Sequence, residues 1–418
     1  MPDLSQVISA QRKERDILLS RSYKPRSMVD QYKPLLASHE IKIITGPRRA
    51  GKSTMALLML HNTNFAYLNF DDNNLLDSWD EDNVTELLSH IYTDYDYLML
   101  DEVQNLDGWH LWVSKLYRQG VNMVITGSNA HMLGSEMATS LTGRYLRIEV
   151  YTLSLSEVLD WQDISTTSLN ENGNLPQVQA IATSYLLNGG YPETILSPSI
   201  CSNYLSTLFD AIIWKDVARR HKVRNVTDLG AISSYLLTLI ACPVTYNSVA
   251  EAVGLNSVTT AKKFMTYLEE PYLFFFLSRY DNKLRLMNRA PRKVYIADNG
   301  FVRAKAFALS DNIGRMLENQ VFVELLRRGY DTERTLFYYR SRNDKEVDFV
   351  TRHSNQIERL IQVCADMSNP KTERREVTSI VECASELKCD NLTIVTLGEN
   401  RTINYSHYEI QVIPIYLF

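Results

Sequence analysis

The sequence predicts an α/β protein whose N-terminal half is built on a parallel β-sheet. Short apolar runs alternate there with helical patterns, which is the order that produces parallel strands joined by crossover helices. The first apolar run also leads directly into a glycine-rich turn that opens a helical pattern. The expected strands are 41–45, 65–70, 97–100, 121–126 and 146–150, and the helices between them include 52–61, 84–92 and 109–119.

The length of 418 residues is too great for one ordinary hydrophobic core and predicts two to three folded domains. Helical patterns dominate the first residues and 177–230, and the polar stretch 162–176 is expected to be a linker or surface loop. We divide the chain into an N-terminal helical segment, the parallel-sheet domain, a helical lid region, a helix-turn-helix domain and a C-terminal α/β domain. Their expected bounds are 1–35, 36–160, 175–230, 231–288 and 289–418.

The composition indicates a folded chain, because 45% of the residues are hydrophobic and 22% are charged. No apolar run approaches the roughly 18 residues of a membrane-spanning helix. The first residues lack the apolar segment and cleavage site of a secretory signal. The five cysteines are widely spaced and form no C-x-x-C pair, which indicates reduced thiols rather than disulfides or a zinc site. We therefore expect a cytoplasmic protein that does not enter a membrane.

Charge is distributed unevenly along the chain, whose formal net charge is −5. Residues 211–345 hold 22 Lys and Arg against 13 Asp and Glu, whereas the rest of the chain is acidic. An anionic partner would therefore meet this basic middle region. The alternative is that these charges only solvate helix faces, since a nucleic-acid footprint is usually more concentrated.

The glycine-rich turn has the pattern G-x-x-x-x-G-K-[ST] between a strand and a helix, which is typical of a phosphate-binding loop. Gly46 and Gly51 allow the backbone to curl so that its N–H groups and the following helix N-terminus attract phosphate oxygens. Lys52 would reach the β- and γ-phosphates of a nucleotide, and Ser53 would ligate Mg²⁺ through its hydroxyl. The expected nucleotide-binding residues of this loop are Gly46, Pro47, Arg48, Arg49, Ala50, Gly51, Lys52, Ser53 and Thr54.

A second strand ends in two carboxylates, Asp101 and Glu102, about 48 residues after the loop. The apolar residues 97–100 bury this strand, and its acidic end emerges at the carboxyl edge of the sheet, beside the loop. We expect Asp101 to bind the nucleotide's Mg²⁺ together with Ser53. Glu102 would polarise the attacking water.

The next strand ends in Ser128 and Asn129, and an arginine, Arg144, follows a turn before the last strand. Asn129 is the first candidate for contact with the γ-phosphate or the water, and Ser128 is the second. The alternative for this segment is a turn with a helix cap. Arg144 is either a surface residue or a group that stabilises transition-state charge, often on a neighbouring subunit. The second interpretation predicts a homo-oligomer.

These motifs in this order resemble the prokaryotic AAA+ (P-loop) ATPases that carry a C-terminal domain of unknown function 4143. The resemblance covers nearly the whole chain. It implies an AAA-type ATPase module, a winged helix-turn-helix and a terminal region similar to the restriction-endonuclease core, and it favours ATP over GTP. The matching segments are 44–53 (ITGPRRAGKS), 98–104 (LMLDEVQ), 125–130 (ITGSNA), 141–144 (LTGR), 153–157 (LSLSE), 188–193 (NGGYPE), 296–300 (IADNG), 318–325 (ENQVFVEL) and 346–350 (EVDFV).

The pattern at 245–268 predicts a short helix, a glycine turn and a second helix, which is helix-turn-helix spacing. We expect 272–277 and 284–287 to be the strands of a wing. The second helix carries Lys262 and Lys263 and would enter a DNA groove. Alternatively, this region packs as a lid or an oligomer contact.

An endonuclease-like core needs a helix Glu, a strand Asp and an acid-x-Lys on the next strand to bind metal and activate water. Glu318 and Asp348 match the first two positions, but Gln362 replaces the acid and Cys364 replaces the lysine. We therefore expect a degenerate core without nuclease activity that still binds DNA or protein. The alternative for Glu318 and Asp348 is a buried ion pair with an arginine. Its candidates are Arg340 and Arg342.

We expect this protein to bind and hydrolyse ATP with Mg²⁺ and to use the reaction to drive or switch its C-terminal domains, with DNA contact through 231–345. One alternative is a regulatory ATPase switch whose C-terminal domains bind a protein partner. Another is an ATP-dependent DNA-processing enzyme with a working nuclease.

Overall fold

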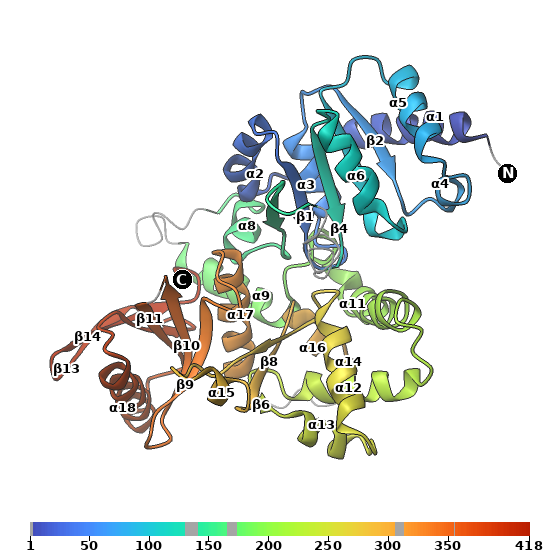
Figure 1. Ribbon diagram of the computed structural model, residues 1–418. Coiled ribbons are helices and arrows are strands. Elements are labelled where there is room, and N and C mark those ends of the chain that lie inside the picture. The colour runs from blue at the N-terminus through green and yellow to red at the C-terminus, as the bar shows by residue number, and fades with distance from the viewer. Residues whose placement is uncertain (1–2, 130–140, 165–173, 306–312, 355) are drawn as a thin grey trace. The chain divides into compact units, whose positions relative to one another are not determined.

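The computed structural model describes residues 3–129, 141–164, 174–305, 313–354 and 356–418. The chain divides into two compact units (Figure 1). The N-terminal unit comprises Met1–Tyr151 and Glu270–Tyr272, and the C-terminal unit comprises Thr152–Glu269 and Leu273–Phe418. Among the described residues, no helix has the length and apolar character needed to cross a membrane.

The N-terminal unit is built on a five-stranded parallel sheet with the order β2-β3-β4-β1-β5. The prediction of a parallel sheet with five strands is confirmed. Its strands are β1 (Ile41–Thr45), β2 (Phe65–Asn69), β3 (Tyr97–Asp101), β4 (Met123–Gly127) and β5 (Tyr145–Glu149). The helical elements are α1 (Leu4–Leu19), α2 (Ser27–Tyr32), η1 (Lys33–Ala37), α3 (Lys52–Met59), α4 (Asn73–Asp77), α5 (Glu81–Ile91), η2 (Val103–Asn105) and α6 (Trp109–Arg118).

Burial explains why the central strands form. Every residue of β1 and β4 is buried, as expected for parallel strands that are covered on both faces. Two clusters of buried apolar side chains pack against the sheet: one includes residues of α1, α5 and α6, and the other includes residues of α3. Because all five strands are parallel, their carboxyl ends meet at one edge of the sheet.

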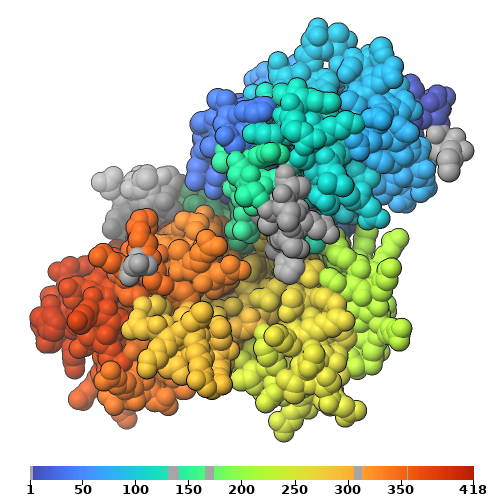
Figure 2. All heavy atoms as spheres, viewed as in Figure 1, coloured from blue at the N-terminus to red at the C-terminus, as the bar shows by residue number. Residues whose placement is uncertain are grey.

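The first part of the C-terminal unit is mainly helical, as the sequence predicts. The helix-turn-helix spacing is present: two helices, α13 and α14, flank Gly254, whose φ of +70° suits the turn between them. The stretch that contains α13 and α14 is yellow in Figure 2 and reaches the surface in this view. The helical elements are α8 (Leu155–Asp160), α9 (Leu175–Asn188), α10 (Pro192–Leu196), η4 (Pro198–Ile200), α11 (Cys201–Ala211), the π-helix η5 (Ile212–Arg219), α12 (Val226–Thr238), α13 (Tyr246–Ala252), α14 (Val258–Glu269), α15 (Leu284–Met287) and α16 (Asn299–Lys305).

The predicted wing is partly wrong. A strand is present at β7 (Phe274–Leu277), but the second predicted strand, Leu284–Met287, is the short helix α15. Its leucines are exposed, so the alternating apolar pattern there has no sheet to cover. The strand that pairs with β7 is the buried β8 (Arg292–Ile296), which also pairs with β6 (Pro243–Val244).

The second part of the C-terminal unit is a six-stranded mixed sheet with the order β13-β14-β12-β11-β10-β9. Strands β9, β10 and β11 are antiparallel neighbours, whereas β11, β12 and β14 run parallel. Buried residues of α18 and of this sheet form one apolar cluster. The elements are α17 (Ile313–Arg327), β9 (Leu336–Arg340), β10 (Glu346–His353), β11 (Gln356–Val363), α18 (Pro370–Leu387), β12 (Leu392–Thr396), β13 (Arg401–Tyr405) and β14 (Tyr408–Pro414).

Candidate nucleotide-binding site

The loop between β1 and α3 has a backbone that only glycine accommodates at its ends. Gly46 has a φ of +145°, and a Cβ there would lie 2.0 Å from the carbonyl oxygen of Val150. Gly51 has a φ of +93° and immediately precedes the first residue of α3. The loop therefore turns tightly at the carboxyl edge of the sheet and leads directly into a helix N-terminus, which attracts anions.

A buried arginine from the N-terminal segment supports this loop. The Arg26 guanidinium donates hydrogen bonds to the carbonyl oxygens of Ala50, at 3.0 Å, and Tyr151, at 3.1 Å. Sequence reasoning missed this residue, because an arginine 20 residues before the loop belongs to no motif. Arg26 ties the loop to the segment that follows β5, and so holds the loop in its curled form.

Lys52 lies between the loop and the carboxylates. Its side chain is buried, and its Nζ donates a hydrogen bond to the carbonyl oxygen of Pro47 at 3.0 Å. The same nitrogen is 3.8 Å from Oε1 of Glu102. The ammonium therefore stands between the loop and the carboxylate, at the position where the phosphates of a nucleotide would lie.

Asp101 ends β3 beside the first turn of α3. Ser53 Oγ donates a hydrogen bond to its Oδ1 at 2.7 Å, and Thr126 of β4 donates another to the same oxygen. Burial and the neighbouring charge of Glu102 raise the pKa of Asp101 to about 6, although the two hydroxyl donors act in the opposite direction. A buried carboxylate with a shifted pKa beside a hydroxyl is the kind of pair that a hard cation would bind.

Glu102 has an unusual backbone, with a φ of +53° and a ψ of 42°. Its N–H donates to Thr126 Oγ1 at 3.0 Å, and its carboxylate accepts hydrogen bonds from Gln104 and, at 3.1 Å, from Ser128. Burial by itself raises the pKa of Glu102, but the charge of Lys52 and these hydrogen bonds outweigh it, so the pKa is lowered overall. Glu102 is therefore held as a carboxylate in a fixed, strained position, which is common at functional sites.

The structure brings together most of the predicted site residues but separates one. The loop, Asp101, Glu102 and Ser128 meet at the carboxyl edge of the sheet, and the buried Asn129 directly follows Ser128. Arg144 lies at the opposite, amino-terminal edge, where its carbonyl accepts from Ile41 N–H and its guanidinium contacts Ser114 and the ring of Tyr117. Within one chain, Arg144 is therefore apart from the other candidates.

Two residues of this network, Thr126 and Gln104, were not predicted as site residues. Thr126 donates to Asp101 and accepts from the Glu102 N–H, so it links the two acids. Both residues lie inside segments that resemble the family, 98–104 and 125–130, but nothing in those segments marks them as ligands. Their roles depend on β3 and β4 being neighbours, which the sequence does not state.

The residues present fit a nucleotide with a divalent cation. Glycine turns, a helix N-terminus and Lys52 are suited to phosphate oxygens, and Ser53 with Asp101 presents two hard oxygen atoms. Among the described residues, no group of three or more His, Cys, Asp and Glu is arranged to hold a metal. A cation here would therefore complete its shell with phosphate and water oxygens, as Mg²⁺ usually does.

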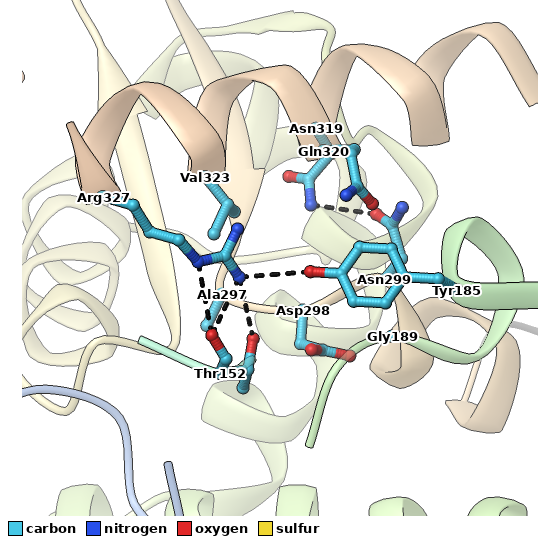
Figure 3. Close-up of a pocket in the computed structure, with 10 residues that line it drawn as sticks. All are labelled: Thr152, Tyr185, Gly189, Ala297, Asp298, Asn299, Asn319, Gln320, Val323 and Arg327. Carbon is cyan, nitrogen blue, oxygen red and sulfur yellow. Dashed lines mark hydrogen bonds between the residues drawn. The ribbon is translucent and has the colours of Figure 1, made fainter. Parts of the chain in front are cut away.

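Three of the segments that resemble the family, 188–193, 296–300 and 318–325, contribute residues to a separate buried cluster within the C-terminal unit (Figure 3). The Arg327 guanidinium on α17 donates to the carbonyl oxygens of Thr152 and Leu153 and contacts the Tyr185 hydroxyl at 3.2 Å. Asp298 accepts hydrogen bonds from the backbone N–H groups of Gly190 and Gly300. The remaining cavity is about 10 Å³, at most the size of one water, so this cluster supports the fold and has no room for a ligand.

The expected partners of Glu318 and Asp348 are wrong. Both carboxylates pair with Lys293 of β8, at 2.9 Å, rather than with an arginine. Arg340 is 3.3 Å from Asp344 instead. The lysine is far from both acids in sequence, so only the packing of β8 against α17 and β10 reveals it.

The other two positions of the expected nuclease core do not contribute to this cluster. Gln362 donates a hydrogen bond from Nε2 to Glu376 at 2.8 Å, and the Cys364 thiol contacts the carbonyl oxygen of Asp366.

Burial and the charge of Asp348 raise the pKa of Glu318 to about 7.

Comparison with protein families identifies three domains along the chain. Residues 38–159 match the AAA domain, 180–311 match domain of unknown function 8612, and 313–418 match domain of unknown function 4143. The chain therefore carries an AAA domain followed by these two domains of unknown function. The AAA domain implies ATP binding and ATPase activity.

Comparisons with whole proteins find relatives without an assigned function. An uncharacterized protein of Methanocaldococcus jannaschii is 29% identical over 397 residues, covering 91% of this chain and 88% of the relative. An uncharacterized protein of Haemophilus influenzae is 29% identical over 334 residues, covering 76% of this chain and 80% of the relative. Among solved structures, a Walker-type ATPase of Pyrococcus abyssi is similar, with a TM-score of 0.44, 12% identity and coverage of 68% of this chain and 95% of that chain.

Proposed function

We propose that this protein is a Mg²⁺-dependent ATPase whose AAA domain drives or switches its C-terminal domains. The observation that carries the proposal is the hydrogen-bonded network at the edge of the parallel sheet. There the loop lysine, a loop hydroxyl and two adjacent carboxylates converge beside a helix N-terminus. This combination matches the parts that phosphoryl transfer from ATP requires.

Each residue of the network has a distinct role in the proposal. The loop backbone and Lys52 would bind the phosphates, while Ser53 and Asp101 would hold Mg²⁺. Glu102, held as a carboxylate, would orient and polarise the attacking water, and Asn129 would contact that water or the γ-phosphate. Mg²⁺ supplies charge neutralisation on the phosphates when it is bound.

Two variants test the site directly. Lys52→Ala should abolish ATP binding in calorimetry, because charge-assisted hydrogen bonds to two phosphates are each worth about 1.5–3 kcal/mol. Glu102→Gln should retain ATP affinity and slow phosphate release by about 10²–10⁴-fold, the usual contribution of a general base. Unchanged affinity in the lysine variant would refute the site, and unchanged turnover in Glu102→Gln would refute the role of that carboxylate.

Arg144 has a role in this proposal only across subunits, since it lies away from the loop of its own chain. We propose that it stabilises transition-state charge in a neighbouring subunit of a homo-oligomer. The ATPase rate per protein should then fall on dilution, and Arg144→Ala should lower turnover more than it lowers affinity. A rate that is independent of concentration would contradict this part.

For the C-terminal unit we propose a helical lid region in 175–230, a winged helix-turn-helix that begins at 231, and a degenerate endonuclease-like domain within 289–418. Because β7 pairs with β8 rather than with 284–287, the wing in this proposal extends past residue 288. The order of Glu318 on α17, Asp348 on β10 and Gln362 on the next strand supports the endonuclease-like assignment. The missing acid and lysine support the absence of nuclease activity. Plasmid cleavage with Mg²⁺ or Mn²⁺ would contradict it.

DNA contact through 231–345 is the partner that the charge distribution supports. Lys262 and Lys263 are exposed on α14, the second helix of the helix-turn-helix. DNA should then raise the ATPase rate, and binding should weaken steeply as salt increases. If DNA neither binds nor stimulates, the regulatory alternative with a protein partner takes precedence.

A further inference from the structure

Three carboxylates converge on one ammonium group inside the C-terminal unit. Lys293 Nζ is 2.9 Å from Glu318 Oε1, 2.8 Å from Glu346 Oε1 and 2.9 Å from Asp348 Oδ1. The Tyr295 hydroxyl also donates to Glu318 Oε1, at 2.7 Å. The lysine side chain is only 2% exposed. The three acids come from α17 and β10, whereas the lysine comes from β8 of the small three-stranded sheet.

This arrangement needs a cation. Three carboxylates brought together repel one another, and two of them, Glu318 and Asp348, also lose most of their hydration, while Glu346 stays 31% exposed. A positive charge among them offsets that cost. Carboxylate oxygens gathered in this way are the ligand type that Mg²⁺ or Mn²⁺ takes in proteins. Here a compact ammonium with three N–H donors occupies the centre and contacts one oxygen of every acid.

Two of the remaining carboxylate oxygen atoms also have neighbours. Asp348 Oδ2 accepts the backbone N–H of Val363 at 2.9 Å, and Glu346 Oε2 is 4.0 Å from Arg340 Nε. Gln362, at the position of a third ligand in an endonuclease-like core, donates to Glu376 instead. A divalent cation in this cluster would have to displace the lysine and break these contacts. The residues present therefore do not fit the metal that an active endonuclease core holds.

We propose that the Lys293 ammonium permanently takes the place of a divalent cation in this carboxylate cluster, so that the C-terminal sheet domain is a metal-free module. The lysine at the same time fastens β8 of the small sheet to α17 and β10. This proposal deepens the proposed absence of nuclease activity and rests on the endonuclease-like assignment of the terminal domain. It is independent of ATP hydrolysis.

The proposal predicts that removal of the ammonium creates a metal site. Lys293→Ala leaves three carboxylates around an empty space that a hydrated cation can enter. Lys293→Met removes the same charge but refills the space, and so serves as the matched control. Lys293→Ala should bind one more Mn²⁺ per chain than the parent, at least tenfold more tightly than Lys293→Met. A further Glu318→Gln substitution in the alanine variant should abolish that gain.

The experiment is calorimetric titration of nucleotide-free full-length protein with Mn²⁺, with bound Mn²⁺ also counted by electron paramagnetic resonance. The parent and Glu318→Gln should bind the same number of Mn²⁺ ions. Ser53→Ala, added to the parent and to each variant, identifies any Mn²⁺ ion that is bound at the nucleotide loop. Failure of the ATPase proposal can then be distinguished from failure of the proposal for Lys293. If Lys293→Ala unfolds, 1 mM Mn²⁺ should restore its far-ultraviolet circular dichroism, while Lys293→Met should not respond.

Either of two results would overturn the proposal. Loss of a Mn²⁺ ion from the parent on Glu318→Gln would mean that the cluster already holds a metal. Absence of extra Mn²⁺ binding, and of Mn²⁺-dependent refolding, in Lys293→Ala would mean that the ammonium does not stand in for a cation.

Discussion

Two buried lysines stand beside carboxylates in this protein, and they differ in how closely they approach them. Lys52 of the loop is 3.8 Å from Glu102 and directs a hydrogen bond to a carbonyl oxygen of its own loop. Lys293 of the C-terminal unit is within 2.9 Å of three carboxylate oxygens. The first ammonium lies beside the loop at a longer distance from its carboxylate, whereas the second is in direct contact with three acids.

The neighbours of the acids differ in the same way. Asp101 and Glu102 are oriented by uncharged donors, mainly hydroxyl and amide groups of Ser53, Thr126 and Gln104. Such donors fix the position of a carboxylate without neutralising it, which leaves its charge for a bound cation or water. In the C-terminal cluster an ammonium in direct contact with the acids offsets part of their charge. The comparison teaches that the groups bound to clustered carboxylates, more than the carboxylates themselves, distinguish a ligand-binding site from a structural ion cluster.

The largest expected difference between the two lysines is in stability. Lys293→Met should lower the free energy of unfolding of the C-terminal unit by about 3–5 kcal/mol, because it leaves buried carboxylates without their counter-charge. Lys52→Met should change the free energy of unfolding by less than about 1 kcal/mol while removing nucleotide binding. Urea unfolding followed by circular dichroism measures the first quantity and calorimetry the second. Equal destabilisation by both substitutions would remove the distinction.

The next prediction concerns the hydroxyl that links the two acids of the ATPase site. Thr126→Val should lower ATP turnover about tenfold, since one buried hydrogen bond to a charged group is worth about 1.5 kcal/mol. ATP affinity should stay within about threefold, because the side-chain hydrogen bonds of Thr126 are with Asp101 and Glu102 and not with the loop. Thr126→Ser, which keeps the hydroxyl, should restore turnover. Steady-state phosphate release checks this prediction, and a valine variant with parental turnover would show that the link is dispensable.

A smaller effect is expected from the arginine that supports the loop. Arg26→Ala should weaken ATP binding by about fivefold to tenfold, as the Ala50 carbonyl loses a hydrogen bond that holds the loop. The exposed Arg21 provides the matched control, and Arg21→Ala should leave affinity unchanged. Equal losses in both variants would indicate a general charge effect rather than support of the loop.

The last prediction is a pH dependence of stability from Glu318, which contacts Lys293 and Tyr295 and lies near Asp348. Its pKa is raised from 4.5 to about 7 by burial, so the folded protein binds a proton more tightly than the unfolded chain does. The stability that this group contributes is therefore greatest below pH 4.5 and is lost as the pH rises to about 7. Glu318→Gln should remove this slope, which one proton limits to about 1.4 kcal/mol per pH unit. Unfolding free energies of both proteins between pH 5 and 8 provide the test, and parallel curves would contradict it.

The sequence alone determined the parallel sheet, its phosphate-binding loop pattern and the acids at the end of a buried strand. These features are local: a strand, a glycine turn and a helix start lie within a few residues, so side-chain alternation and turn chemistry specify them. The prediction of a second wing strand at 284–287 was wrong because a local pattern this short does not specify one structure. Four residues of alternating apolar character at 284–287 are too few to distinguish a strand from a short helix without a sheet to pair with.

Only the tertiary structure decided which distant side chains meet. Arg26, Thr126 and Lys293 act through contacts with residues 24 to 125 positions away, so no sequence motif contains both partners. The sequence left Arg144 open between a surface residue and a residue that acts on a neighbouring subunit, and parallel pairing placed it at the opposite edge of the sheet from the loop. The charge environment of a buried carboxylate depends on which elements pack around it, and that packing is a property of the whole fold.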